Sequence, residues 1–145
     1  MNIIITKKDL DKIDLCLNQV VSSSQAHSAL LIDRSGQLIA QHGSTPGIDI
    51  LSLSALTAAN FGATAEIARI LGEEEFTLLF HKGKNENVYF SAIGEDVIMV
   101  TLFDDKTSLG LIRLQINKII DELAKILSSI FEKDRSKSSE PMRSS

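Results

Sequence analysis

The sequence predicts a small α/β (α+β) domain with three layers, in which helices cover both faces of one antiparallel sheet. A chain of 145 residues suits a single domain. Its hydrophobic content is 43% with only 5% aromatic residues and no Trp, so Ile, Leu, Val and Ala must fill the core. Apolar spacing changes along the chain in the order α-β-β-α-β-β-β-α. Short connections between successive strands favour a five-stranded antiparallel sheet, with the central helix on one face and the terminal helices on the other.

The first predicted helix covers residues 7–23 and begins after Thr6, a good N-cap residue. Its apolar positions recur at helical spacing: Leu10, Ile13, Leu17, Val20 and Val21. Cys16 lies in this helix, where we expect it to pack. Because it is the one cysteine of the chain, no intramolecular disulfide can form, which fits a reducing compartment.

Two strands, at 28–33 and 38–41, are predicted to form a hairpin. The residues between them, Asp33-Arg34-Ser35-Gly36, have the composition of a tight turn, in which Gly36 can take a positive φ. We expect Arg34 to be solvated, as turn arginines usually are. The loop at 43–47, which contains Pro46, ends the second strand.

The central helix is predicted at 49–71, with Gly72 as its left-handed cap. Small residues share one of its faces: Ser52, Ala55, Ala59, Gly62 and Ala63. Such a face lets another backbone approach closely, either a partner or the helix's own sheet, and periodicity alone does not decide between the two. Larger residues remain to fill a core, namely Leu53, Leu56, Ile67 and Ile70.

Three further strands are predicted at 76–82, 87–93 and 97–103. The last is a nearly continuous apolar run, which is typical of a central strand covered on both faces. A final helix at 109–133 carries a wide apolar stripe. From Asp134 the composition turns to Ser, Lys, Glu and Pro, so we expect a folded domain at 1–133 and a disordered polar tail at 134–145.

Composition and motifs exclude several functions. The net charge is −4 without a basic cluster, which argues against a nucleic-acid partner. No apolar stretch of the required length follows a basic region, so we expect neither a signal peptide nor a membrane span, and a cytoplasmic protein. Neither a Walker A motif nor a dinucleotide fingerprint occurs, and we expect no nucleotide site and no cofactor.

Catalytic patterns are equally weak. His27, His42 and His81 are scattered, without the spacing of zinc ligands, and we expect them at strand ends on the surface. Ser52 and Ser54 lie in a helix without a nucleophile elbow. Asp104 and Asp105 are adjacent, so their side chains should point apart, in an acidic loop that caps the last helix. We therefore expect no active site in this chain.

Taken together, the order of elements, the small-residue helix and several strings resemble the roadblock/LC7 family, which has a profilin-like fold. The similarity is closest to its MglB-type members, the bacterial partners of the Ras-like GTPase MglA. The matching strings include ALLIDRSGQLI at 29–39, LSALTAAN at 53–60, LGE at 71–73, Phe76, HKG at 81–83 and LFDDKTSLGLIRL at 102–114.

The resemblance implies a homodimer in which the central helices pair and the third strands join edge to edge. The implied dimer interface contains Ser52, Ala55, Phe76, Leu78 and Phe80. MglB-type dimers bind the GTP form of MglA and accelerate hydrolysis without an arginine finger, by aligning the catalytic groups of the GTPase, in cell polarity or gliding motility. This implies a cytoplasmic protein that can concentrate at a cell pole.

Four residues of the central helix are the expected contacts with the GTPase: Ala59, Gly62, Ala63 and Glu66. Glu66 stands where MglB-type relatives often keep a small residue, so it either narrows the groove or adds a charged contact. Arg69 is placed to pair with it along the helix. The alternative function is a roadblock scaffold that recruits other proteins whatever their nucleotide state. A GTPase activator should instead bind the GTP form of its partner preferentially, so this preference distinguishes the two functions.

Overall fold

The computed structural model of the chain describes residues 5–74 and 79–139. Within them the chain forms the elements in the predicted order: α1 (Lys7–Ser24), β1 (Ser28–Asp33), β2 (Leu38–Gly43), α2 (Ile50–Ile70), β3 (Leu79–Lys82), β4 (Asn87–Ile93), β5 (Val97–Phe103) and α3 (Leu109–Ser139). Thr6 caps α1, because its Oγ1 accepts a hydrogen bond from the Asp9 N–H at 3.1 Å. Both the class of fold and the order of elements are confirmed.

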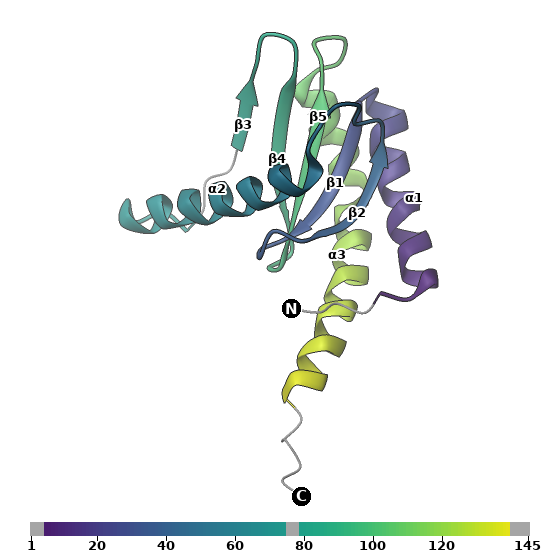
Figure 1. Ribbon diagram of the computed structural model, residues 1–145, viewed down its shortest axis with the longest axis vertical. Coiled ribbons are helices and arrows are strands. Elements are labelled where there is room, and N and C mark those ends of the chain that lie inside the picture. Colours follow the sequence, from purple (N-terminus) through teal and green to yellow (C-terminus); the bar gives the residue numbers. More distant parts are fainter. Residues whose placement is uncertain (1–4, 75–78, 140–145) are drawn as a thin grey trace, which may run out of the picture.

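The five strands form one antiparallel sheet in the order β2-β1-β5-β4-β3 (Figure 1). Every residue of β5 is buried, which confirms the prediction that this strand is central. β2 and β3 are the two edges of the sheet. An edge strand leaves a row of backbone groups unpaired and therefore needs a cover or a partner.

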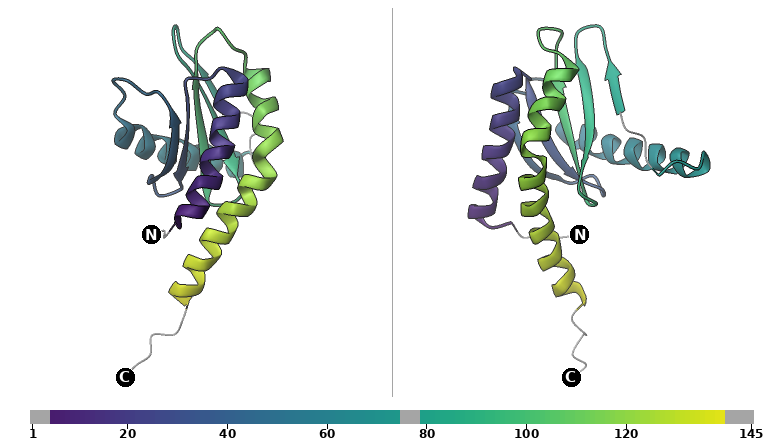
Figure 2. Two further views of the ribbon diagram at one scale, coloured as in Figure 1. Left: turned by 90° about the vertical axis from the view of Figure 1, so that its right-hand side faces the viewer. Right: turned by 180° about the vertical axis from the view of Figure 1, so that it is seen from behind.

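Helices cover both faces of the sheet. α1 and α3 lie side by side on one face, and α2 crosses the other (Figures 1 and 2). The core beneath α1 and α3 is the larger and includes Leu17, Met99, Ile112, Leu123 and Phe131. Beneath α2 lies a second cluster, formed by Leu30, Ile32, Phe90, Ile98, Val100 and Leu102. The three predicted layers are therefore present.

Some boundaries differ from the prediction. β2 continues to Gly43, past the expected end at residue 41. β3 is described from Leu79 onward, so Phe76 and Leu78 lie outside the described residues. α3 continues to Ser139, past its predicted end at residue 133, while the disordered tail stays a prediction. Residues 134–139 read DRSKSS, so good helix formers do not explain the extension. Adding residues to a helix that is already formed costs little, and a polar segment can therefore still extend it. Residues 140–145 lie outside the described part.

Both ends of α2 are capped by residues of its own segment. Asp49 is the N-cap and accepts hydrogen bonds from Ser52 N at 3.1 Å and Ser52 Oγ at 2.6 Å. At the other end Gly72 has φ +79°, which confirms the predicted left-handed cap, and Glu73 N donates to Ala68 O at 2.8 Å.

The larger residues of α2 fill the core only in part. Leu53 packs on the sheet as expected, whereas Leu56, Ile67 and Ile70 are exposed, so their assignment to the core is wrong. For Ile67 and Ile70 the reason is that α2 runs across the strands and its C-terminal part projects past the sheet edge at β3 (Figures 1 and 2). A helix in that position has a sheet on one side at most. Leu56 lies earlier in the helix, on the side that faces away from the sheet.

Candidate protein-interaction surface

The side of α2 that faces away from the sheet carries all four residues predicted to bind a partner. Ala59, Gly62, Ala63 and Glu66 are each exposed, because the helix turns only Ser54, Thr57 and Ala68 fully into the protein. A Cβ atom built at Gly62 would meet nothing within 4 Å. The structure therefore brings these residues together on one accessible face, while their contact with a partner stays a prediction.

Glu66 and Arg69 form the predicted pair along the helix. Arg69 Nε donates to both carboxylate oxygens of Glu66, at 3.0 and 3.1 Å. These bonds lower the pKa of Glu66 below its usual value and raise the pKa of Arg69. Because both groups are solvated, the pair contributes little to stability, but it neutralises much of the charge that Glu66 brings to the surface.

Residues assigned to the dimer interface also have contacts inside the protomer. Ser52 bonds the N-cap residue of α2. Ala55 lies against Gly36 of the β1–β2 turn. Phe80 is half-buried and stacks on Phe103 with ring centroids 5.9 Å apart, so its side chain points into the protomer although its backbone lies on the edge strand. The dimer contacts of these three residues stay predictions, as do those of Phe76 and Leu78.

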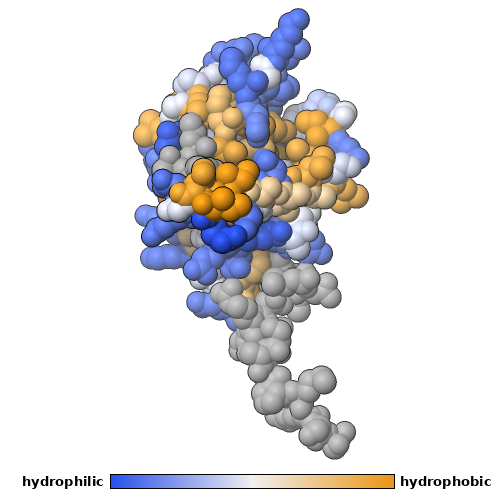
Figure 3. Space-filling view, turned by 90° about the vertical axis from the view of Figure 1, so that its left-hand side faces the viewer, coloured by the Kyte–Doolittle hydropathy of each residue, from blue (hydrophilic) through white to orange (hydrophobic). Residues whose placement is uncertain are grey.

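Exposed apolar side chains surround the small face of α2. The solvent-accessible fraction is 79% for Leu51, 68% for Leu56, 52% for Ile67, 70% for Ile70 and 66% for Leu71. Figure 3, which looks onto the projecting end of α2, shows apolar side chains gathered there. By length and composition alone, α2 is also apolar enough to cross a membrane. In this fold, however, α2 turns one side onto the sheet, with Ser54, Thr57 and Ala68 buried and Leu53 and Phe61 half-buried. The apolar side chains on its other side form a surface patch of the kind that marks an interaction site.

Arg34 is exposed, as expected for a turn arginine, and it also makes two contacts within the protomer. Its guanidinium lies over the ring of Phe61 in α2, with Cζ 5.6 Å from the ring centroid. Its Nε donates a hydrogen bond to the backbone oxygen of Glu95 in the β4–β5 turn. Sequence patterns do not show such a contact, because the three segments are distant in the chain and meet only in the folded sheet.

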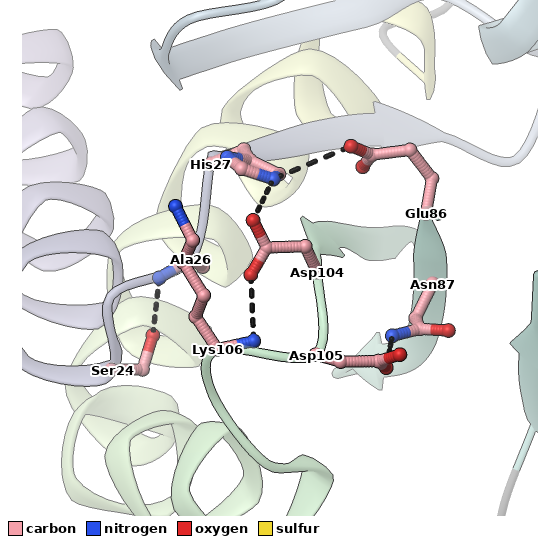
Figure 4. A network of polar contacts seen from close by, with 8 residues as sticks. All are labelled: Ser24, Ala26, His27, Glu86, Asn87, Asp104, Asp105 and Lys106. Carbon is pink, nitrogen blue, oxygen red and sulfur yellow. Dashed lines mark hydrogen bonds and ion pairs between the residues drawn. The ribbon is translucent and has the colours of Figure 1, made fainter. Parts of the chain in front are cut away.

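A polar network joins the loops at one end of the sheet (Figure 4). His27 Nε2 lies 3.2 Å from Asp104 Oδ2 and 3.3 Å from Glu86 Oε1. Asp105 Oδ1 accepts hydrogen bonds from Lys82 Nζ at 2.9 Å and from the Asn87 amide at 3.0 Å. The two adjacent carboxylates therefore point apart, as predicted, and the network ties the β3–β4 turn to the loop before α3.

The expected acidic cap of α3 is wrong. Ser108 Oγ accepts the hydrogen bond from Leu111 N at 3.1 Å, so a serine caps the helix and leaves Asp104 and Asp105 to the network. Among the side chains that the structure describes, in residues 5–74 and 79–132, no group of three or more His, Cys, Asp or Glu is arranged to hold a metal ion.

These features define a class of protein: a small domain whose prominent surface is an exposed helix face and an open strand edge, suited to binding other proteins. Comparison with known proteins gives the family. Residues 12–103 match the Roadblock/LC7 domain, and the chain belongs to that family.

Solved structures refine the assignment within the family. MglB of Myxococcus xanthus is 42% identical, with a TM-score of 0.77; the match covers 81% of this chain and 96% of that one. Gliding protein MglB of Thermus thermophilus is 27% identical over 88% of this chain and 97% of its own, with a TM-score of 0.81. The chain is thus of the MglB type. Profilin IB of Acanthamoeba castellanii shares the fold alone, with 16% identity, a TM-score of 0.55 and coverage of 77% and 96%.

Proposed function

We propose that this chain is a homodimeric regulator that binds a Ras-like GTPase of the MglA type in its GTP form and accelerates hydrolysis. The observation that carries the proposal is the 42% identity to Myxococcus xanthus MglB across 96% of that protein. A regulator of this kind has no active site of its own. It acts in the cytoplasm, at a cell pole, in polarity or gliding motility, and the relative from Thermus is itself called a gliding protein.

The surface of α2 supports the GTPase contact. Ala59, Gly62 and Ala63 are small and exposed, so the backbone of a partner can approach the helix closely. Arg69 holds the Glu66 carboxylate along the helix axis. This position favours a charged contact between Glu66 and the GTPase over a side chain that blocks the approach of the GTPase.

Two further features support a dimer. β3 is an edge strand, and a second copy of β3 would satisfy its free backbone groups. Apolar residues beside it on α2, such as Ile67 and Ile70, are exposed in the protomer. A two-fold axis between the copies would cover both features at once, because such an interface uses the same patch twice.

The proposed activator does not insert an arginine into the active site of the GTPase. Consistent with this, two arginines near the surface of α2 already have partners within the protomer. Arg34 is held by Phe61 and Glu95, and Arg69 is held by Glu66. Phosphoryl transfer depends mostly on positioning and charge stabilisation, so a partner that aligns the catalytic groups of the GTPase is sufficient.

The test is GTP hydrolysis by a purified MglA-type GTPase at increasing concentrations of this protein. We expect acceleration that saturates near two chains per GTPase. Gly62→Arg should abolish it, because the new side chain enters open space in the protomer and blocks only the partner. Gly110→Arg is the matched control: this residue is also an exposed helical glycine, but it lies in α3 on the opposite face of the sheet.

Two outcomes would redirect the proposal. Binding of equal strength to the GTP and GDP forms, without acceleration, would favour the scaffold function. Acceleration that appears only after Glu66→Ala would show that the carboxylate blocks the groove in the natural chain.

A further inference from the structure

Arg34 joins three segments that meet at one end of the β1–β5–β4 region. Its backbone N–H donates to Asp96 O at 3.2 Å, and its side chain donates to the carbonyl oxygen of Glu95. The same guanidinium lies on the ring of Phe61, in the middle of α2. One side chain of the β1–β2 turn therefore connects α2 to the β4–β5 turn.

α2 has few other attachments to the sheet. Of its 21 residues, Ser54, Thr57 and Ala68 are fully buried, and larger side chains such as Leu53 and Phe61 are half-buried against the second core cluster. The β1–β2 turn touches the helix at two places: Gly36 at Ala55, near the start, and Arg34 at Phe61, near the middle. Besides the packing of α2 on the sheet, the turn thus holds the helix at two separate places, and the contact at Arg34 is the one near the middle of the helix.

We propose that Arg34 is a positioning residue that fixes the orientation of α2 and thereby presents the exposed face around Gly62 to the partner. Gly62 directly follows Phe61, so a shift of the Phe61 ring moves the partner face with it. This inference rests on the proposed function, and it gives Arg34 a part in GTPase binding without any contact with the nucleotide.

The contact chemistry requires arginine. A guanidinium is planar and can stack on an aromatic ring while its Nε–H donates a hydrogen bond in the same plane. Lysine offers a point charge and cannot make both contacts in this geometry. Arg34→Lys should therefore behave much like Arg34→Ala, which distinguishes positioning from a simple need for positive charge.

Hydrogen exchange of the full chain tests the structural part alone. In Arg34→Ala, we expect the amides around Phe61 in α2 to exchange about tenfold faster, while those of α1 and α3 change less. Phe61→Leu should give at least as large an increase, because it also removes packing on the second core cluster. The double variant should add little to Phe61→Leu, because the contact with Arg34 is already lost there. Full additivity, or equal acceleration in every helix, would overturn the proposal.

Hydrolysis by the MglA-type GTPase tests the functional part. We expect Arg34→Ala to raise the half-saturating concentration of this protein several-fold and to leave the maximal rate unchanged, because α2 must be reoriented before it binds. Ile13→Val, which loosens the core under α1, is the control: it lowers stability without touching α2 and should not shift half-saturation.

The two failures are distinguishable. If the natural chain does not accelerate hydrolysis, the proposed function fails, and the exchange results still decide whether Arg34 orients α2. If the natural chain is active and Arg34→Ala keeps the same half-saturating concentration, the positioning role is overturned.

Discussion

Gly36 in the β1–β2 turn lies directly against Ala55 of α2: a Cβ atom on Gly36 would be 3.1 Å from the Ala55 Cα. Gly36 also has φ +96°, a conformation that favours glycine. The nearest atoms belong to the backbone of α2, so it is position 36 that must stay small for the turn to lie this close to the helix. The close approach of the β1–β2 hairpin to α2 therefore depends on the glycine in the turn.

Replacement of Gly36 by Ala should destabilise the protein by about 2 kcal/mol, from strained φ and the close approach to Ala55 together. Gly47→Ala is the matched control. Gly47 also has a positive φ, +73°, but a Cβ there meets nothing within 4 Å, so we expect a loss of only about 1 kcal/mol. Urea unfolding measures both. Equal losses of unfolding free energy in the two variants would show that the contact of Gly36 with α2 does not affect stability.

Two leucines of α1 should respond very differently to truncation. Leu17 is fully buried between α1 and the sheet, whereas Leu15 is 69% exposed. Leu17→Ala should cost about 3 kcal/mol through the lost burial and the cavity. Leu15→Ala should cost less than about 0.5 kcal/mol. Thermal and urea unfolding of the two variants check this, and similar losses would mean that the outer side of α1 is covered in solution.

Stability should fall in acid partly through Asp105. The hydrogen bond from Lys82, aided by that from Asn87, holds the pKa of Asp105 below its usual value of 3.8. The unfolded chain therefore binds a proton at a higher pH than the folded chain. The contribution is fully present above about pH 4 and is lost as the pH falls through the lower folded pKa.

Asp105→Asn removes this linkage, so its unfolding midpoint should depend less steeply on pH between about 4 and 2 than that of the natural chain. Urea midpoints across this range provide the measurement, with Asp14→Asn, an exposed residue of α1 outside the network, as the control for a lost charge. An unchanged slope would mean that the Lys82 contact does not persist in solution.

A dimer that covers the apolar side of α2 should dissociate when a charge is placed there. Ile67 is 52% exposed in the protomer, unlike Phe80, whose ring packs inside, so Ile67→Glu disturbs little else. Sedimentation velocity should show dimers for the natural chain and for Gly62→Arg, and monomers for Ile67→Glu. Monomers for Gly62→Arg would place the dimer contact on the face assigned here to the GTPase.

Local chemistry was sufficient to predict most elements of the fold. Thr6 and Gly72 mark helix ends because their backbone roles are decided by neighbours within a few residues. The apolar run of β5 reveals a central strand for the same reason. α3 ends later than predicted, because a helix that is already formed can extend through polar residues whose composition alone suggests disorder.

Some features of the candidate site also follow from the sequence, and others only from the tertiary structure. The sequence by itself determined that Ala59, Gly62 and Ala63 share a face, because helix periodicity depends only on spacing. Only the tertiary structure decided that this face points away from the sheet, that Leu56 and Ile67 are exposed beside it, and that Arg34 reaches Phe61. These facts depend on the angle at which α2 crosses the strands, which is set by contacts between residues far apart in the chain.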